Sequence, residues 1–300
     1  MRIVFVGAIE FSRHCLREVL RLGGNVVAVF TLPPEMGKAR HSDYADLRPL
    51  AEEHGIPLHQ ADDLNGSPDA IAAYSPTVLF CFGWSVMLQP HILEIPKPLG
   101  CIGSHPALLP RNRGRHPVIW AIQLGLRETG LTFFRMTPQA DAGPIISQRT
   151  FRLFPIDNAG TVYHRVCESA GGQIREFLPD LMAGKLGFVP QDPDITPNYW
   201  RKRGPGDGLI DFRMSSAAIC RLVRALSRPY PGAHVRYRGR DVKVWMACDE
   251  GPIIGHGNVE PGKVLDFPRD GIYVKSGDGM VRLMEHEFGD RLPDVGEYIR

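Results

Sequence analysis

No apolar run in this sequence of 300 residues approaches the roughly 20 residues that a membrane-spanning helix needs. The first residues also lack the pattern of a secretory signal peptide, since charges at Glu10 and Arg13 follow a short β-rich run. The composition is 43% hydrophobic and 23% charged, which is ordinary for a globular protein. We therefore expect a soluble, cytoplasmic protein with no membrane partner.

The sequence also has no closely spaced pair of cysteines and only a small net charge. Its six cysteines form no Cys-x-x-Cys pair, so we expect reduced structural thiols and no metal. The net charge is only +2, whereas a nucleic-acid-binding protein usually carries a concentrated basic face. The charge balance therefore argues against a nucleic-acid partner.

A Gly-x-Gly-x-x-Gly fingerprint is missing, because Gly7 stands alone after the first apolar run. A nicotinamide cofactor is therefore not supported. Short apolar runs instead alternate with helical patterns, which is typical of an α/β fold with a doubly wound, mostly parallel sheet. Strands are predicted over residues 2–7, 25–31, 56–58, 77–83, 101–105, 131–136 and 145–153. Helices are predicted over residues 11–22, 41–54, 117–124, 161–183 and 215–226.

The texture of the chain changes over residues 192–208, which are rich in Pro, Gly, Arg and Lys. Such a stretch is typical of a linker or a long surface excursion. From residue 233 onward, short β-runs separated by glycines predict a small open barrel. We therefore predict a first domain over residues 1–190, a linker over 191–208 and a barrel-like domain over 209–300.

Two polar residues stand out in the first domain. His105 ends a predicted strand, where open α/β sheets bind their ligands, and Asp141 follows in a later turn. A neutral imidazole beside a carboxylate can take a proton from an amine as that amine attacks a carbonyl carbon. By themselves, the two residues could equally be a buried histidine bonded to a backbone carbonyl and an aspartate capping its own turn.

The residues around this pair resemble the folate-dependent formyltransferase family, which includes methionyl-tRNA formyltransferases and sugar-nucleotide N-formyltransferases. The family pattern runs roughly Asn-x-His-x-Ser-Leu-Leu-Pro, then Arg-Gly-x-x-Pro, then Asp-x-Gly-x-Ile. The corresponding residues here are Gly103-x-His105-x-Ala107-Leu108-Leu109-Pro110, Arg113-Gly114-Arg115-His116-Pro117 and Asp141-Ala142-Gly143-Pro144-Ile145. The opening residues 1–7 and residues 224–233 add to the resemblance, which spans nearly the whole chain.

The resemblance implies a Rossmann-like formyltransferase domain followed by an OB-like open barrel, with N10-formyltetrahydrofolate as co-substrate. It implies that His105 is the general base and that Asp141 is its partner, which assists proton transfer to the departing folate nitrogen. Asp157, a nearby carboxylate, is instead expected to begin the helix near Thr161. The resemblance places the folate-binding residues at Phe82, Gly83, Trp84, Met87, Leu88, Arg113, Gly114, Gln139 and Ala140.

Several of these residues have a plainer explanation. The aromatic cluster that contains Phe82 and Trp84 could simply pack in the core. The alternating arginines Arg111, Arg113 and Arg115 could grip a phosphate or a carboxylate, or could form a solvated basic loop.

Gly103 departs from the family pattern, which has an asparagine that orients the formyl group and stabilises the oxyanion. Loss of one such donor can cost about 100- to 1000-fold in rate. Three explanations compete: a water fills the space, another donor such as a backbone N–H near Gly114 replaces the amide, or the reaction differs. The hydrolase domain of formyltetrahydrofolate dehydrogenase resembles this chain in lacking the asparagine, which keeps the third explanation open.

The acceptor is predicted from the segment over residues 32–44, where methionyl-tRNA formyltransferases carry a basic insertion. Here only Lys38 and Arg40 are cationic, so we favour a small amine, with an amino-sugar nucleotide as the first choice. Methionyl-tRNA, a hydrolase reaction and a non-catalytic binding protein remain as alternatives. The barrel-like domain could bind a sugar nucleotide, support a homodimer or stabilise the fold. The basic residues that keep the tRNA alternative open are Arg201, Lys202, Arg203 and Arg213.

Overall fold

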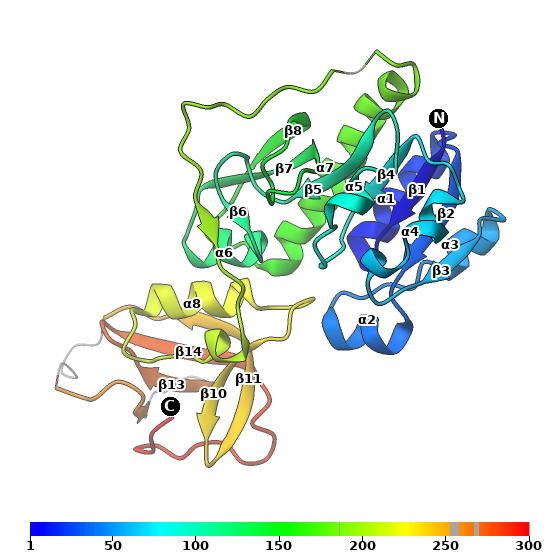
Figure 1. Cartoon of the computed structure of the whole chain (residues 1–300). Helices are drawn as coiled ribbons and strands as arrows, with labels where there is room; N and C mark the ends of the chain where they lie inside the picture. The colour runs from blue at the N-terminus through cyan, green and yellow to red at the C-terminus, as the bar shows by residue number, and fades with distance from the viewer. Residues whose placement is uncertain (186, 253–257, 267–269, 300) are drawn as a thin grey trace. The chain divides into compact units, whose positions relative to one another are not determined.

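The computed structural model describes residues 1–185, 187–252, 258–266 and 270–299. Its contacts divide the chain into two compact units, each with its own sheet and core (Figure 1). Unit 1 comprises Met1–Pro117, Glu128–Arg152 and His164–Arg201. Unit 2 comprises Val118–Arg127, Leu153–Tyr163 and Lys202–Arg300.

A seven-stranded sheet forms the centre of unit 1, in the order β3-β2-β1-β4-β5-β7-β8. The first five strands of that order pair in parallel, and β7 and β8 add on antiparallel. The predicted doubly wound, mostly parallel sheet is thereby confirmed. The strands are β1 (Ile3–Val6), β2 (Val26–Thr31), β3 (Leu58–Gln60), β4 (Val78–Cys81), β5 (Gly100–His105), β7 (Glu128–Arg135) and β8 (Ile145–Arg152).

The central strands β1 and β4 are buried on both faces, which explains their continuous apolar runs. On one face, Ile71 and Ile92 from two short helices pack against alternate residues of β1, β2 and β4. On the other face, aromatic rings follow one another at centroid distances of 5.1–5.7 Å, from Phe5 through Phe82 and Phe133 to Phe177. A rigid core therefore lies on both sides of the strands that end at the site.

The predicted helix over residues 41–54 is wrong in its first half. Residues 41–47 are not helical, because Asp43 and Ala45 exchange backbone hydrogen bonds with Glu10 and Ala8 instead. This pairing interrupts the helical pattern, which resumes at residue 48 with a proline in the first turn. The helices of the chain are α1 (Glu10–Arg21), α2 (Pro34–Arg40), α3 (Arg48–Glu53), α4 (Pro68–Ala72), α5 (Pro90–Leu93), α6 (Pro117–Gln123), α7 (Ala159–Met182) and α8 (Ser216–Ala225).

Unit 2 contains a five-stranded antiparallel sheet in the order β10-β11-β14-β13-β12. The sheet curls, and α8 packs against it (Figure 1). The predicted barrel-like architecture is confirmed in this form; residues 253–257, 267–269 and 300 of the predicted β-rich stretch lie outside the described residues. The strands are β10 (Ala233–Tyr237), β11 (Arg240–Asp249), β12 (Val264–Leu265), β13 (Ile272–Lys275) and β14 (Met280–His286).

Two very short strands complete unit 1. β6 (Arg113–Gly114) pairs in parallel with β9 (Tyr199–Trp200). The chain passes from unit 1 to unit 2 for the last time between Arg201 and Lys202. Within the described ranges, no helix combines the length and the apolar character needed to cross a membrane.

Candidate active site

His105 ends β5 and is almost fully buried, with 5% of its surface exposed. Its Nε2 lies 2.7 Å from the carbonyl oxygen of Asn112. A carbonyl oxygen only accepts, so Nε2 must carry a proton. In the neutral ring, the lone pair is therefore on Nδ1, which faces Asp141 at 3.7 Å. The ring offers a base at Nδ1.

Asp141 lies in a tight turn after β7, with a φ of 54° in the left-handed region. Its Oδ2 accepts a hydrogen bond of 2.9 Å from the backbone N–H of Gly114. The same oxygen is 3.7 Å from Nδ1 of His105, which is too long for a hydrogen bond. The structure thus brings the two predicted catalytic residues together, but the Asn112 carbonyl, and not Asp141, orients the ring. The catalytic roles of both residues stay a prediction.

Gly103, where the family has asparagine, lies in the middle of β5 opposite Phe134 of β7. A Cβ added at Gly103 would lie 2.9 Å from Cγ and 3.2 Å from Sδ of Met136. Met136 therefore fills the space beside Gly103 that a side chain or a water would need. The Gly114 N–H already donates to Asp141, so a backbone donor that replaces the asparagine amide would have to come from a residue near Gly114 and not from Gly114 itself.

Two of the predicted folate-binding side chains are part of the core. Phe82 is fully buried between the rings of Phe5 and Phe133, and Leu88 is 2% exposed among the residues around Ile92. Their side chains cannot line a pocket, because both are already covered by the packing of the sheet. These two residues can therefore present only backbone groups to a ligand, and their part in binding folate stays a prediction.

The residues between Phe82 and Leu88 form a loop whose side chains are less buried than those two. Trp84 Nε1 is a buried donor without a hydrogen-bond partner in the part of the chain that the structure describes. Met87 is 45% exposed, and Gly83 makes a left-handed turn with a φ of 75°. A flat heterocycle can pack on the exposed thioether of Met87, whereas the indole N–H of Trp84 is covered in this arrangement of the loop.

Ser85, which follows Trp84 in this loop, connects the loop to a histidine and an arginine. Its Oγ is 3.2 Å from Nε2 of His41, and its carbonyl oxygen accepts a hydrogen bond of 2.7 Å from Arg115. Burial lowers the pKa of His41, and the charges of Arg115 and Arg40 lower it further against the opposing effect of Asp43. His41 is therefore held mostly neutral at physiological pH.

Arg113 is buried rather than free to grip a ligand. It donates to Gln191 and to the hydroxyl of Tyr199, at 2.6 and 2.9 Å. The hydrogen bond from Arg113 to the Tyr199 hydroxyl lowers the pKa of Tyr199 below its ordinary value, because the guanidinium stabilises the phenolate. Gln139 donates to the same hydroxyl at 3.3 Å, and Ala140 is half-buried beside Asp141.

Sequence reasoning missed three polar residues of this network, namely Gln191, Asn198 and Tyr199. They lie in the stretch that the sequence predicts as a linker, where no periodicity distinguishes functional residues from solvated ones. Asp157 behaves as expected at the start of α7, where it accepts from the backbone N–H of Phe154 and from the hydroxyl of Thr161. All six cysteines are free thiols, and the described residues hold no group of three or more His, Cys, Asp or Glu suited to a metal ion.

The sequence of the chain matches two models of known protein families. The Formyl transferase family model matches residues 1–176, and the model of the Formyl transferase C-terminal domain matches residues 203–296. The methionyl-tRNA formyltransferase of Aromatoleum aromaticum is 33% identical over 304 residues, which cover 100% of this chain and 94% of that protein. The methionyl-tRNA formyltransferase of Thermotoga neapolitana is 31% identical over 286 residues, which cover 94% of this chain and 89% of that protein.

Solved structures share the fold at lower identity. WlaRD, a sugar 3N-formyl transferase crystallised with dTDP and 5-N-formyl-THF, superposes with a TM-score of 0.68 at 17% identity, over 94% of this chain and 96% of that one. HypX from Aquifex aeolicus in complex with tetrahydrofolic acid gives a TM-score of 0.67 at 21% identity, over 95% of this chain and 44% of that one. With two family models matched in sequence and near-complete coverage of curated relatives, the chain belongs to the formyl transferase family and is a formyltransferase.

Proposed function

We propose that this enzyme transfers the formyl group of N10-formyltetrahydrofolate to the amine of methionyl-tRNA. The observation that carries the choice of acceptor is the full-length similarity to relatives named methionyl-tRNA formyltransferases, 33% identical over the whole chain. This reverses the preference for an amino-sugar nucleotide that we drew from the charges of residues 32–44. Formyltetrahydrofolate is the co-substrate of this family, and the exposed thioether of Met87 offers a surface on which its flat pterin can pack.

The site accounts for the chemistry with two residues of this chain. As the acceptor nitrogen attacks the formyl carbon, Nδ1 of His105 takes the proton that the nitrogen loses. The carboxylate of Asp141, 3.7 Å away, stabilises the imidazolium that results. The bond between the formyl carbon and the folate nitrogen then breaks, and the imidazolium returns its proton to that nitrogen. The products are the formylated amine and tetrahydrofolate.

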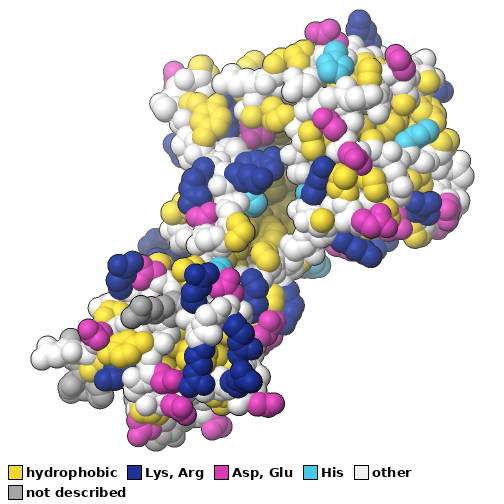
Figure 2. Space-filling view, turned by 60° about the horizontal axis from the view of Figure 1, so that its bottom comes forward, with side chains coloured by type: hydrophobic (Ala, Val, Ile, Leu, Met, Phe, Trp, Pro, Cys, Tyr) yellow, Lys and Arg dark blue, Asp and Glu magenta, His cyan; other side chains and the backbone are white. Residues whose placement is uncertain are grey.

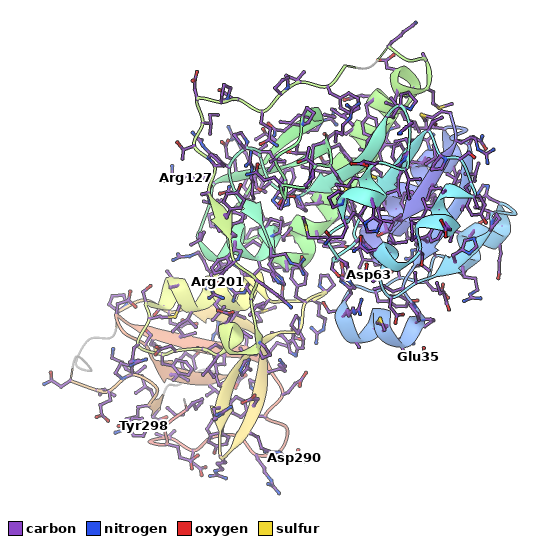
Figure 3. The ribbon with its side chains drawn as sticks, viewed as in Figure 1. Glu35, Asp63, Arg127, Arg201, Asp290 and Tyr298 are labelled. Carbon is purple, nitrogen blue, oxygen red and sulfur yellow. The ribbon has the colours of Figure 1, made fainter. Side chains whose placement is uncertain are left out.

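An amino-sugar nucleotide is a second candidate acceptor, and the charges on α2 favour it. The helix offers Lys38 and Arg40, and Glu35, which it also carries, offsets part of their charge (Figure 3). Arg40 already donates to the carbonyl of Asp62. On the face seen in Figure 2, basic side chains alternate with acidic ones. Phosphate neutralisation dominates the affinity for nucleic acids, whereas a nucleoside diphosphate needs only a few cationic contacts.

The test compares acceptors at fixed donor concentration. The protein is incubated with N10-formyltetrahydrofolate, and tetrahydrofolate release is followed spectroscopically with methionyl-tRNA, with a dTDP-linked amino sugar, or with buffer alone. Release that depends on methionyl-tRNA and declines steeply with added salt is the expected result. Release only with the amino sugar would overturn the tRNA proposal in favour of the second candidate.

Two further outcomes test the hydrolase reaction and the non-catalytic binding protein, the alternatives that the missing asparagine at Gly103 leaves open. Equal release in buffer alone would show transfer to water, and the transferase proposal would then be wrong. No release in any arm would favour a non-catalytic binding protein. His105→Ala serves as the control in each arm, since contaminating activity would survive this substitution.

A further inference from the structure

Residues 189–200, which we call the strap, cross the catalytic loops of unit 1 and are tied down at both ends. At one end, Val189 and Ile145 exchange backbone hydrogen bonds of 2.7 and 2.8 Å. At the other end, β9 pairs with β6, and Arg113 and Arg115 donate backbone N–H groups to Asn198 and Trp200 at 3.0 Å. The strap is therefore fixed on both sides of the His105–Asp141 pair.

Near its second end, the strap reaches His105 through Asn112. Oδ1 of Asn198 accepts the backbone N–H of Asn112 at 2.8 Å, and Nδ2 of Asn198 donates to Oδ1 of Asn112 at 3.1 Å. Asn112 has a φ of 61°, a left-handed conformation that must be held by its surroundings. The carbonyl of this held residue is the one that accepts from Nε2 of His105. Asn198 thus holds in place the Asn112 carbonyl, which keeps the proton of His105 on Nε2 and the lone pair on Nδ1.

Near its first end, the strap holds Asp141. Nε2 of Gln191 donates to the backbone carbonyls of Asp141 and Gly143, at 2.8 and 2.9 Å. Oε1 of Gln191 accepts from Arg113 at 2.6 Å, which fixes the direction in which the amide points. Asp141 has a left-handed φ of 54°, a strained conformation that persists when neighbouring contacts hold it.

We propose that Asn198 and Gln191 are positioning residues, one for each member of the catalytic pair, so that the strap sets the geometry of proton transfer. Asn198 holds His105 in the tautomer with the lone pair on Nδ1. Gln191 holds the turn that aims the carboxylate of Asp141 at that nitrogen. The activity readouts rest on the proposed function, whereas the tautomer of His105 can be measured without any reaction.

Position 198 must supply a hydrogen-bond acceptor, whereas position 191 must supply a donor. Acidic substitutions at the two positions should therefore have different effects. The hydrogen bond from the Asn112 N–H needs an acceptor at position 198, which Asn198→Asp still supplies. The side-chain contact between the two residues then requires the Asn112 amide to turn, so that its Nδ2 donates to the second carboxylate oxygen. Asn198→Asp should therefore keep both contacts, and Asn198→Ala should lose both. The carbonyls of Asp141 and Gly143 need donors at position 191, so Gln191→Glu should fail as fully as Gln191→Ala. A role in filling space would make both acidic variants equally mild.

The expected losses fall on kcat. Asn198→Ala, Gln191→Ala and Gln191→Glu should each lower kcat about 10- to 100-fold, the range that a small misplacement of a catalytic group costs. KM should change by less than about three-fold, because neither amide is proposed to touch a substrate. Asn198→Asp should stay close to the parent. Asp194→Ala, which changes an exposed residue of the same strap, is the control and should have parental kinetics.

A second measurement follows the ring itself. The 15N resonances of His105, read at a pH where the ring is neutral, should report a proton on Nε2 in the parent, in Asn198→Asp and in both Gln191 variants. In Asn198→Ala they should report a mixture of tautomers. An unchanged tautomer in Asn198→Ala, or equal kcat in Gln191→Glu and the parent, would overturn the proposal. An inactive parent with the predicted tautomer change would instead count against the proposed function alone.

Discussion

The catalytic loops of unit 1 and the sheet of unit 2 hold their shape by different kinds of polar contact. Around His105, neutral amides and backbone groups, such as those of Gln191 and Asn198, hold the loops through directional hydrogen bonds. The charged side chains there, Arg113 and Asp141, bond to these neutral groups. In unit 2, the prominent contacts are exposed ion pairs, such as Arg238–Glu297 and Arg228–Glu285, both at 2.7 Å.

Because the two regions use different kinds of contact, substitutions in them should affect different properties, catalysis in the first and stability in the second. Hydrogen bonds between neutral groups are directional and little affected by salt, so a small change at the site should be seen in kcat before it is seen in unfolding. Exposed ion pairs contribute little and are screened by salt. Changes in unit 2 should therefore be seen, if at all, in how stability depends on pH and salt.

The largest expected effect follows from removing the base in unit 1. His105→Ala should lower kcat by about 100- to 10,000-fold, the range that general base catalysis contributes. Steady-state kinetics, with the acceptor that supports tetrahydrofolate release in the comparison of acceptors, measures the loss. Because His105 is buried, His105→Gln is made in parallel, since its amide N–H can still serve the Asn112 carbonyl and keep the loop in place.

Asp141→Asn separates the charge of the partner from its hydrogen bond. An amide oxygen at this position can still accept from Gly114, so the turn should persist, and circular dichroism should show the parental melting curve. The imidazolium loses its neighbouring charge, so kcat should fall, but by less than in His105→Ala. Activity within a few-fold of the parent in either variant would remove the pair from the mechanism.

Much of the central sheet could be predicted from the sequence, because its middle strands are buried on both faces. The runs over Ile3–Val6 and Val78–Cys81 are continuous and apolar, and each forms a strand within one or two residues of its predicted bounds. The predicted helix over residues 41–54 failed because Asp43 and Ala45 pair with the segment before α1. That pairing depends on residues more than 30 positions away, which a local pattern does not record.

The site was predictable only where a motif marks it. His105 and Asp141 were found because they stand in recognisable patterns, and the structure brings them within 3.7 Å. Gln191 and Asn198 stand in a stretch without periodicity, and their partners are known only once the strap is placed. The proton on Nε2 of His105 likewise follows from the Asn112 carbonyl, a contact that sequence spacing does not reveal.

A smaller effect is expected at Gly103, and it concerns packing rather than charge. Gly103→Ala places a Cβ against Met136, 2.9 Å from its Cγ. Because the methionine side chain is flexible, we expect a cost near the lower end of overpacking, about 1 kcal/mol in the free energy of unfolding. Urea unfolding at low and high salt should give the same cost, in contrast to the ion pairs of unit 2.

The double variant with Met136→Ala tests the cause of this cost. Removal of the methionine side chain takes away the crowding, so the two substitutions together should cost less than the sum of the single effects. Strictly additive costs would mean that Met136 does not determine the space at Gly103. The space beside Gly103 could then hold the water that is one of the three explanations for the missing asparagine.

The smallest effect concerns Glu297 in unit 2, whose pKa is lowered from 4.5 to about 2 by hydrogen bonds from Tyr237, Arg238 and the backbone N–H of Asp294. A carboxyl with a depressed pKa stabilises the fold fully above its unfolded value and loses that contribution as the pH falls through its folded value. Glu297→Gln should therefore lower the melting temperature by a few degrees at most at neutral pH, and its curve should converge on the parental one between pH 4.5 and about 2. Asp290→Asn changes the charge of an exposed side chain by the same amount (Figure 3) and should give no such convergence. A difference between Glu297→Gln and the parent that persists at the acid end would show that shape, and not charge, holds this corner of the sheet, and the contrast between the two units would then be lost.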